Sequence, residues 1–207
     1  MPKQTNKRAA NRRVSQNKSP VTINGQNQVA LTTPIYRPIY KFARTITGTA
    51  FDVVNDGINP SLYSFQFTLN SLPNPSDFTG LFDMFRFSKI EIDWVPEYTE
   101  LTDAAPLSNA VNVRFNSAID LSDNTAPVSV DQVLQYQNCV STGITKPHRR
   151  SWMPSILLSG AIPCHSWVPS ASASTAHLGI KVAVPPCGVS MTFRARVKIH
   201  LECANVY

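Results

Sequence analysis

The strongest constraint on the fold is a strict alternation of apolar and polar residues near the C-terminus. Every odd position from Val189 to Cys203 is apolar, whereas the even positions carry Ser, Thr, Arg, Lys, His and Glu. Because side chains alternate between the two faces of a strand, this segment predicts a β-strand with one apolar and one cationic face. It is much longer than the usual strand of about 5–6 residues. We therefore expect it in the centre of a sheet, with a second layer packed on its apolar face.

Five further segments show the same period of two and predict half-buried strands. They cover residues 40–46, 63–69, 90–94, 111–119 and 178–184. Two weaker candidates, Thr145–Met153 and Ile162–Val168, bring the total to eight. Many separated strands with long connections indicate a two-sheet sandwich in a single domain.

Two short helices are predicted in the connections. Asn74 is a suitable N-cap and Pro75 a suitable first residue for a helix that reaches Phe85. Its apolar stripe consists of Phe78, Leu81, Phe82 and Phe85, at the spacing of one helix face. A second helix is predicted from Ser129 to Tyr136, where Ser129 and Gln132 have the spacing of a capping box. We expect both helices to cover open ends of the core.

Charge divides the chain into a basic arm, residues 1–36, and a shell domain, residues 37–207. The first 44 residues contain nine cations and no acid: Lys3, Lys7, Arg8, Arg12, Arg13, Lys18, Arg37, Lys41 and Arg44. The rest of the chain has a net charge of −3, against +6 for the whole. The arm is rich in Asn, Gln, Ser and Thr, so we expect it to be disordered and to bind the phosphates of a nucleic acid. A solubilising tail and a nuclear-import signal are the alternatives for the same cations.

Two more groups of cations are candidate nucleic-acid contacts. The polar face of the C-terminal strand carries Arg194, Arg196 and Lys198. These side chains face either a nucleic acid or acidic partners on another strand, for which Glu91 and Asp93 have the right parity. The second group is the run from His148 to Arg150, whose alternative is a solvated strand end.

The residues give little support for a metal site, a disulfide framework or a membrane segment. Glu97, Glu100 and Asp103 could bind calcium, but acidic loops are usually only solvated. No C-x-x-C pair occurs, and the neighbours Cys164 and His165 are too close in sequence to share one tetrahedral site. Cys187 and Cys203 are expected in the core. The chain begins without an apolar segment and has no apolar run of 18 residues, so we expect a soluble protein of a reducing compartment.

Enzyme motifs are missing from the sequence. It contains no G-x-S-x-G, no P-loop, no G-x-G-x-x-G and no H-E-x-x-H. We expect neither catalysis nor a cofactor.

The segment from Leu72 to Pro96 resembles the coat proteins of small circular single-stranded DNA viruses that encode a replication-initiator protein. The matching residues are Leu72-Pro73-Asn74, Phe78-Thr79, Leu81-Phe82-Asp83, Arg86 and the strand Ile90–Val95 before Pro96. Weaker landmarks are Arg149-Arg150 before Pro154, Trp167 and His177-Leu178-Gly179. The resemblance implies an eight-stranded jelly roll that self-assembles into an icosahedral shell, with about 60 copies in the smallest case. It also implies a virion protein and a packaged single-stranded DNA genome. Assembly in the host nucleus is expected if the basic cluster of the arm is a nuclear-import signal.

Other functions are compatible with the same residues. The basic arm and the cationic strand face would serve single-stranded RNA equally well, as in a small RNA or satellite virus. A non-viral β-sandwich binding module with a basic tail is the alternative outside the viruses. An enzyme would require a Ser/His/Asp or metal constellation that only the fold brings together.

Overall fold

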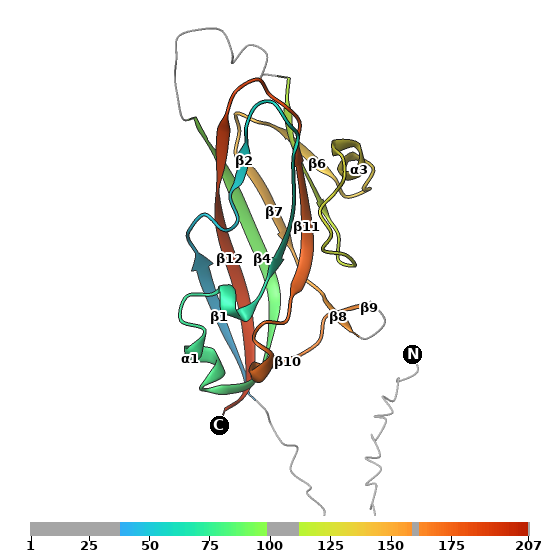
Figure 1. The fold of residues 1–207 in the computed structure, drawn as a ribbon. Coiled ribbons are helices and arrows are strands. Elements are labelled where there is room, and N and C mark those ends of the chain that lie inside the picture. The colour runs from blue at the N-terminus through green and yellow to red at the C-terminus, as the bar shows by residue number, and fades with distance from the viewer. Residues whose placement is uncertain (1–37, 99–111, 159–161, 207) are drawn as a thin grey trace, which may run out of the picture. The chain divides into compact units, whose positions relative to one another are not determined.

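The computed structural model describes residues 38–98, 112–158 and 162–206 (Figure 1). The basic arm, Arg37 and most of the acidic loop after Tyr98 lie outside these residues. The strands are β1 Ile39–Ile46, β2 Val53–Asn55, β3 Ser61–Phe67, β4 Phe82–Tyr98, β5 Arg114–Ile119, β6 Val140–Gly143, β7 His148–Trp152, β8 Ile156–Leu158, β9 Ile162–Cys164, β10 Val168–Pro169, β11 His177–Val184 and β12 Met191–Val206. The α-helices are α1 Ser76–Thr79 and α3 Val130–Leu134, and two 3₁₀ turns lie at Leu69–Ser71 and Ser170–Ser172.

Two antiparallel sheets form the sandwich (Figure 1). The larger has the order β1-β12-β4-β10, with β2 also paired to β12 and β7 also paired to β4. The smaller has the order β3-β11-β5-β6. β1 and β2 pair with successive parts of β12, and β10 and β7 pair with successive parts of β4. Each of these two pairs therefore occupies one strand position, so that each sheet has four positions. The chain visits these eight positions in jelly-roll order, which confirms the predicted fold, and the separate β8–β9 hairpin is an insertion.

The long C-terminal strand lies in the centre of the larger sheet, as predicted. β12 pairs with β1 on one side, from Ile39 opposite Ala204 to Ile46 opposite Val197. On the other side it pairs with nearly all of β4, from Met191 opposite Tyr98 to Val206 opposite Phe82. Six of its eight predicted inward positions are fully buried in one hydrophobic core: Met191, Phe193, Val197, Ile199, Leu201 and Cys203. The predicted apolar residues Phe65, Phe67, Ile90, Ile92, Trp94 and Phe115 pack in the same core.

The predicted helix from Pro75 to Phe85 is wrong over its second half. α1 is a single turn whose N-cap is Pro75, and it ends at the C-cap Gly80. Phe82 already belongs to β4 and lies opposite Val206 in the neighbouring strand, so sheet pairing overrides the helical spacing of the four apolar residues. Phe78, Phe82 and Phe85 are buried, but Leu81 is 54% exposed because it belongs to neither element's inner face.

The second predicted helix exists but covers a sheet face rather than an open end. Ser129 Oγ accepts a hydrogen bond from the Gln132 amide at 3.2 Å, and Gln132 Oε1 accepts one from the Val128 amide at 2.8 Å. In a capping box the Gln132 side chain would accept from the amide of the N-cap residue Ser129. Here it accepts from the amide of Val128, one residue earlier. α3 buries Val133 against Ala118 of β5 and Ala183 of β11 on the outer side of the smaller sheet. All eight residues of β11 are buried, although the alternation predicts only half of them. The cover accounts for Ala183 beneath α3 and for Lys181 beneath the loop before it.

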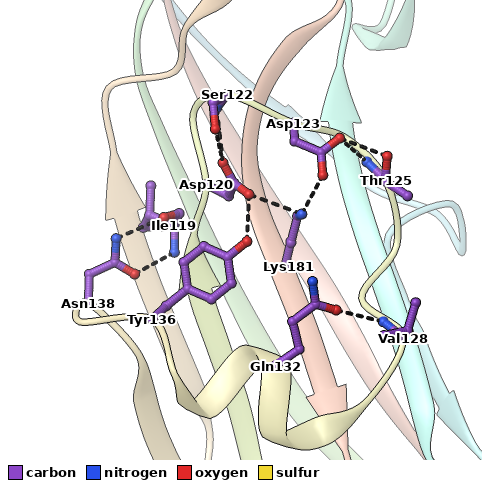
Figure 2. A network of polar contacts seen from close by, with 10 residues as sticks. All are labelled: Ile119, Asp120, Ser122, Asp123, Thr125, Val128, Gln132, Tyr136, Asn138 and Lys181. Carbon is purple, nitrogen blue, oxygen red and sulfur yellow. Dashed lines mark hydrogen bonds and ion pairs between the residues drawn. The ribbon is translucent and has the colours of Figure 1, made fainter.

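Lys181 lies under this cover in a network of polar contacts (Figure 2). Its side chain is 2% exposed, and Nζ lies 2.7 Å from Asp123 Oδ2 and 3.0 Å from Asp120 Oδ2. Tyr136, just after α3, donates its hydroxyl to Asp120 at 2.7 Å. Burial alone would lower the pKa of Lys181, but the hydrogen bonds to both carboxylates raise it, and the bond from Lys181 lowers the pKa of Asp123 to about 2. The network therefore stays charged at neutral pH and holds the loop after β5 on the sheet.

Candidate nucleic-acid interface

The outer face of the larger sheet carries the cationic ladder that the sequence predicts. It is formed by the outward side chains of β1, β12, β4 and β7, which no described element covers (Figure 1). Its cations are Lys41, Arg86, Lys89, Arg149, Arg194, Arg196 and Lys198, and its acids are Asp52, Glu91, Asp93, Glu97 and Glu202. We call this surface the outer face. Its seven cations differ sharply in how far these acids neutralise them.

Arg194 is neutralised by two acids. Its Nη1 lies 2.7 Å from Asp52 Oδ2 and its Nε lies 2.7 Å from Glu97 Oε2. Asp52 also accepts a hydrogen bond from the Ala195 amide at 2.8 Å, so this buried carboxylate fixes the edge of the sheet beside β12. Arg194 is therefore a structural residue first and a weak candidate for phosphate contact.

Lys41 and Arg86 share a single acid at the opposite end of the sheet. Glu202 is 2.7 Å from Arg86 Nη2 and 3.2 Å from Lys41 Nζ. Burial would raise the pKa of Glu202, but the bonds to Arg86 and Lys41 lower it, so the carboxylate is ionised at neutral pH. Two cations around one acid leave a net positive charge here.

Arg196 and Lys198 are exposed in the middle of the face and form no ion pair with any residue that the structure describes. The strand register places them opposite Asp93 and Glu91, as the pairing hypothesis requires. That hypothesis is nevertheless wrong, because Asp93 pairs instead with Arg149 of β7 at 3.0 Å and Glu91 pairs with Lys89 of its own strand. Arg196 and Lys198 line a shallow hollow of about 430 Å³ together with Arg149.

The predicted cluster from His148 to Arg150 does not exist as one surface. His148 is buried in the core, Arg149 points to the outer face, and Arg150 donates to the carbonyls of Ser117 and Asn138 at 3.1 and 3.0 Å. Alternation along β7 separates neighbours that look like one basic patch in the sequence. Only Arg149 joins the candidate interface.

The remaining predicted contacts lie outside the described residues. They are Lys3, Lys7, Arg8, Arg12, Arg13, Lys18 and Arg37. Sequence reasoning selected Arg149 only as part of the run from His148 to Arg150, and it did not select Arg86 or Lys89 as nucleic-acid contacts. Lys89 has the polar parity of the predicted strand 90–94 and could have been selected from it.

A Ser–His contact lies in the core but cannot serve catalysis. Ser117 Oγ is 2.6 Å from His148 Nε2, and Nδ1 of the same ring contacts the Thr142 hydroxyl at 2.7 Å instead of a carboxylate. Ser117 and His148 have no exposed surface. Burial lowers the pKa of His148 to about 4, so the ring is neutral at pH 7 and has a structural role between Trp94 and Phe115.

Metal and membrane features are equally sparse in the described part of the chain. No group of three His, Cys, Asp or Glu side chains there has the arrangement of a metal site. Glu100 and Asp103 of the proposed calcium loop lie outside it, and Glu97 pairs with Arg194. All four cysteines are free, and Cys187 and Cys203 are buried as predicted. None of the described helices has the length and apolar character needed to cross a bilayer.

Comparison with solved structures places this sandwich among viral coats. The capsid protein in the BFDV 60-mer superposes with a TM-score of 0.52 and 14% sequence identity, over 82% of this chain and 92% of that chain. The capsid of the nodavirus of the giant freshwater prawn Macrobrachium rosenbergii gives a TM-score of 0.50 and 10% identity, over 84% and 97%. The Cucumber Necrosis Virus structure gives 0.51 and 11%, over 83% and 57%. These likenesses establish the fold.

The family follows from the sequence itself. No curated protein matches the chain. The family model described as "Circovirus capsid protein", however, matches residues 6–206, which include most of the basic arm and the whole described sandwich. It agrees with the resemblance found at residues 72–96. The chain belongs to the circovirus capsid protein family and is a structural coat protein of the virion.

Proposed function

We propose that this capsid protein assembles into an icosahedral shell and packages single-stranded DNA, bound by the basic arm and by the outer face of the larger sheet. The observation that carries the proposal is the charge distribution in a coat-family chain, with nine cations and no acid in the first 44 residues. Membership of the circovirus family supports DNA over RNA. The BFDV 60-mer supports a shell of about 60 copies.

Electrostatics favours a division of labour between arm and shell. In a shell of that size the six cations of residues 1–36 bring about 360 positive charges together, which repel one another unless a polyanion neutralises them. The shell domain, residues 37–207, has 13 cations and 13 acids and therefore no net charge, so contacts between shell domains do not need the arm to offset a charge. The outer face adds Arg196 and Lys198, whose phosphate contacts weaken as salt rises.

Deletion of residues 1–36 tests the packaging role. The truncated protein keeps every described strand, so we expect it to fold, to form particles and to retain little nucleic acid. The readout is the ratio of ultraviolet absorbance at the nucleic-acid and protein maxima in purified particles, followed by typing with DNase and RNase. A matched variant replaces Lys3, Lys7, Arg8, Arg12, Arg13 and Lys18 with Gln, which keeps the arm's length. Full packaging by both variants would show that the arm is not needed to bind the nucleic acid, and the outer face would then be the remaining candidate.

The arm's cluster from Lys7 to Arg13 also supports entry into the host nucleus before assembly. A fusion of residues 1–36 to a fluorescent reporter should accumulate in nuclei, and the Gln-substituted arm should not. A reporter that stays in the cytoplasm would reject this assignment without affecting the packaging role.

A further inference from the structure

The β8–β9 hairpin is an addition to the eight strand positions and projects to one side of the sandwich (Figure 1). Its base is attached there, because the Leu178 amide donates to the Ser155 carbonyl at 2.7 Å. Further out, Leu158 pairs with Ile162, and no third strand of the described chain extends the two. A hairpin of two strands is marginally stable on its own in water, so this one depends on packing against other surfaces.

One face of the hairpin changes from buried to exposed along its length. The pairs Ile156–Cys164 and Leu158–Ile162 lie two residues apart in each strand, so their side chains share one face. Ile156 is 6% exposed and belongs to the hydrophobic core, against which Cys164 also packs. Leu158 and Ile162 are 51% and 63% exposed. The apolar face that begins in the core thus continues to a place where the described chain leaves it uncovered.

Two neighbouring side chains enlarge this apolar surface. Leu157, on the opposite face of the hairpin, is 38% exposed, and Met153, just before it, is 53% exposed. Four of the thirteen exposed large apolar side chains of the described residues therefore lie between positions 153 and 162. Single exposed apolar residues are normal on protein surfaces, whereas a group of them marks an interaction site. We call Met153, Leu157, Leu158 and Ile162 the apolar cluster.

The sequence around the apolar cluster is free of charge. Residues 151–176 contain no Asp, Glu, Lys or Arg, although these make up 15% of the whole chain. Depletion of charged residues is typical of the core of a protein–protein interface. Nucleic acids and anionic lipid surfaces are bound through Lys and Arg, which this segment lacks. The composition therefore favours another protein surface as the partner.

Pro163 indicates how that partner is contacted. It lies in β9 opposite Leu157 and is exposed. A proline has no backbone N–H, so it blocks the addition of a further strand and is found at strand edges. The apolar cluster is thus suited to packing of side chains rather than to extension of the hairpin by a foreign strand.

We propose that the apolar cluster packs on a second copy of this chain in the assembled shell. Every copy in a closed shell contacts identical neighbours, and permanent contacts between subunits resemble a domain core that has been cut in half. The hairpin face has this character, since it runs from the core at Ile156 to the uncovered Leu158 and Ile162. The inference rests on the proposed shell assembly and assigns to it a specific contact.

The variant L158D/I162D tests the contact in the full-length protein. Both positions are exposed, so we expect the unassembled variant to keep its fold, as checked by circular dichroism. In the shell it would place unpaired carboxylates in an apolar contact, which should raise the protein concentration needed for particles by about tenfold or more. Velocity sedimentation over a range of protein concentrations measures this. L158M/I162V keeps the cluster apolar and should assemble like wild type.

Hydroxyl-radical footprinting gives an independent readout on the wild-type protein. Leu158 and Ile162 should be oxidised in the unassembled chain and severalfold less in purified particles, as located by mass spectrometry. Met191, which is 1% exposed, is the internal reference and should be protected in both samples. This measurement requires no substitution, so it decides the question even if L158D/I162D does not fold.

The outcomes separate the hairpin contact from the shell itself. Particles of L158D/I162D at wild-type concentrations, or equal oxidation of Leu158 and Ile162 before and after assembly, would overturn the inference and leave the shell intact. A variant that assembles normally but no longer attaches to host cells would assign the apolar cluster to a host protein instead. Failure of the wild-type protein to form particles would reject the proposed assembly, and the hairpin contact with it.

Discussion

The outer faces of the two sheets differ in what covers them, although their strands look alike in the sequence. β12 and β11 both alternate, and each carries a lysine on its polar side. Lys198 of β12 is exposed and forms no ion pair with the described residues, whereas Lys181 of β11 lies beneath the loop before α3, bound to Asp120 and Asp123 (Figure 2). One sheet therefore keeps its cations available for a polyanion, and the other uses its cation to attach a loop and a helix.

This difference separates binding from stability within one fold. Buried charges are stabilising only when they are paired, and removal of one partner leaves the other uncompensated. Exposed charges contribute little to stability but retain their full attraction for phosphates. Substitutions on the two faces should consequently affect different measurements.

The largest effect is expected for K181M. The substitution keeps an unbranched chain of similar length but leaves Asp120 buried without its cation, which should lower the free energy of unfolding by about 3–5 kcal/mol. Urea denaturation of the unassembled protein measures it. The matched control K198M should change stability by less than about 0.5 kcal/mol. Equal losses in the two variants would contradict the comparison, and addition of D120N to K181M should restore part of the stability.

The second largest effect is expected from acid, which should lower the stability through the buried His148 between the sheets. The pKa of His148 falls from 6.5 to about 4 because of burial and, secondarily, Arg150. The unfolded chain binds this proton more readily than the folded one, so the contribution of His148 is complete above pH 6.5 and is lost as the pH drops towards 4, by about 3 kcal/mol. Burial also lowers the pKa of His177 to about 4, so His177 adds a loss of the same sign in the same window. The Lys181 network does not contribute in this window, since the pKa of Asp123 is about 2.

A pH series of denaturation curves checks this assignment. H148Q should be less stable at neutral pH but should lose less stability between pH 6.5 and 4 than wild type. K181M should keep the wild-type slope over the same range. If K181M lost less stability between pH 6.5 and 4 than wild type, the acid response would instead belong to the Lys181 network.

The alternation of β12 was sufficient to predict its place in the sheet, because a period of two has only one interpretation over that length. The helix prediction failed at Phe82 and Phe85, where spacings of three and four also fit a strand that starts after a turn. Their pairing with Val206 and Cys203 decides the structure, and these partners lie more than a hundred residues away in the sequence.

The sequence predicted which strand carries the candidate site but not which of its cations are neutralised by acids. Parity placed Arg194, Arg196 and Lys198 on one face, yet only the fold shows that Asp52 and Glu97 neutralise the first. Long charged side chains can reach several neighbours, and Asp93 pairs with Arg149 on a third strand instead of with Arg196.

Loss of the α3 N-cap should weaken only the covered face. S129A removes the acceptor for the Gln132 amide, which typically costs about 1 kcal/mol. Since α3 packs Val133 on β5 and β11, hydrogen exchange should increase in those strands and not in β12 or β4. S174A, at an exposed position, is the control and should leave both stability and exchange unchanged. Increased exchange throughout the sandwich would show that the two faces are one cooperative unit.

The smallest change in stability is expected on the outer face, where two arginines of one strand should behave differently. R196A removes an exposed cation that forms no ion pair with the described chain, so we expect a stability change within about 0.5 kcal/mol. Its effect should appear in binding, as weaker association with single-stranded DNA and a salt dependence lower by about one unit of slope. R194A leaves Asp52 without its cation and should lose more stability but less affinity, because Asp52 and Glu97 already neutralise Arg194. Denaturation and salt titration of the same two variants separate these outcomes. Equal effects on both measurements would mean that ion pairing does not decide which cations of the outer face reach the nucleic acid.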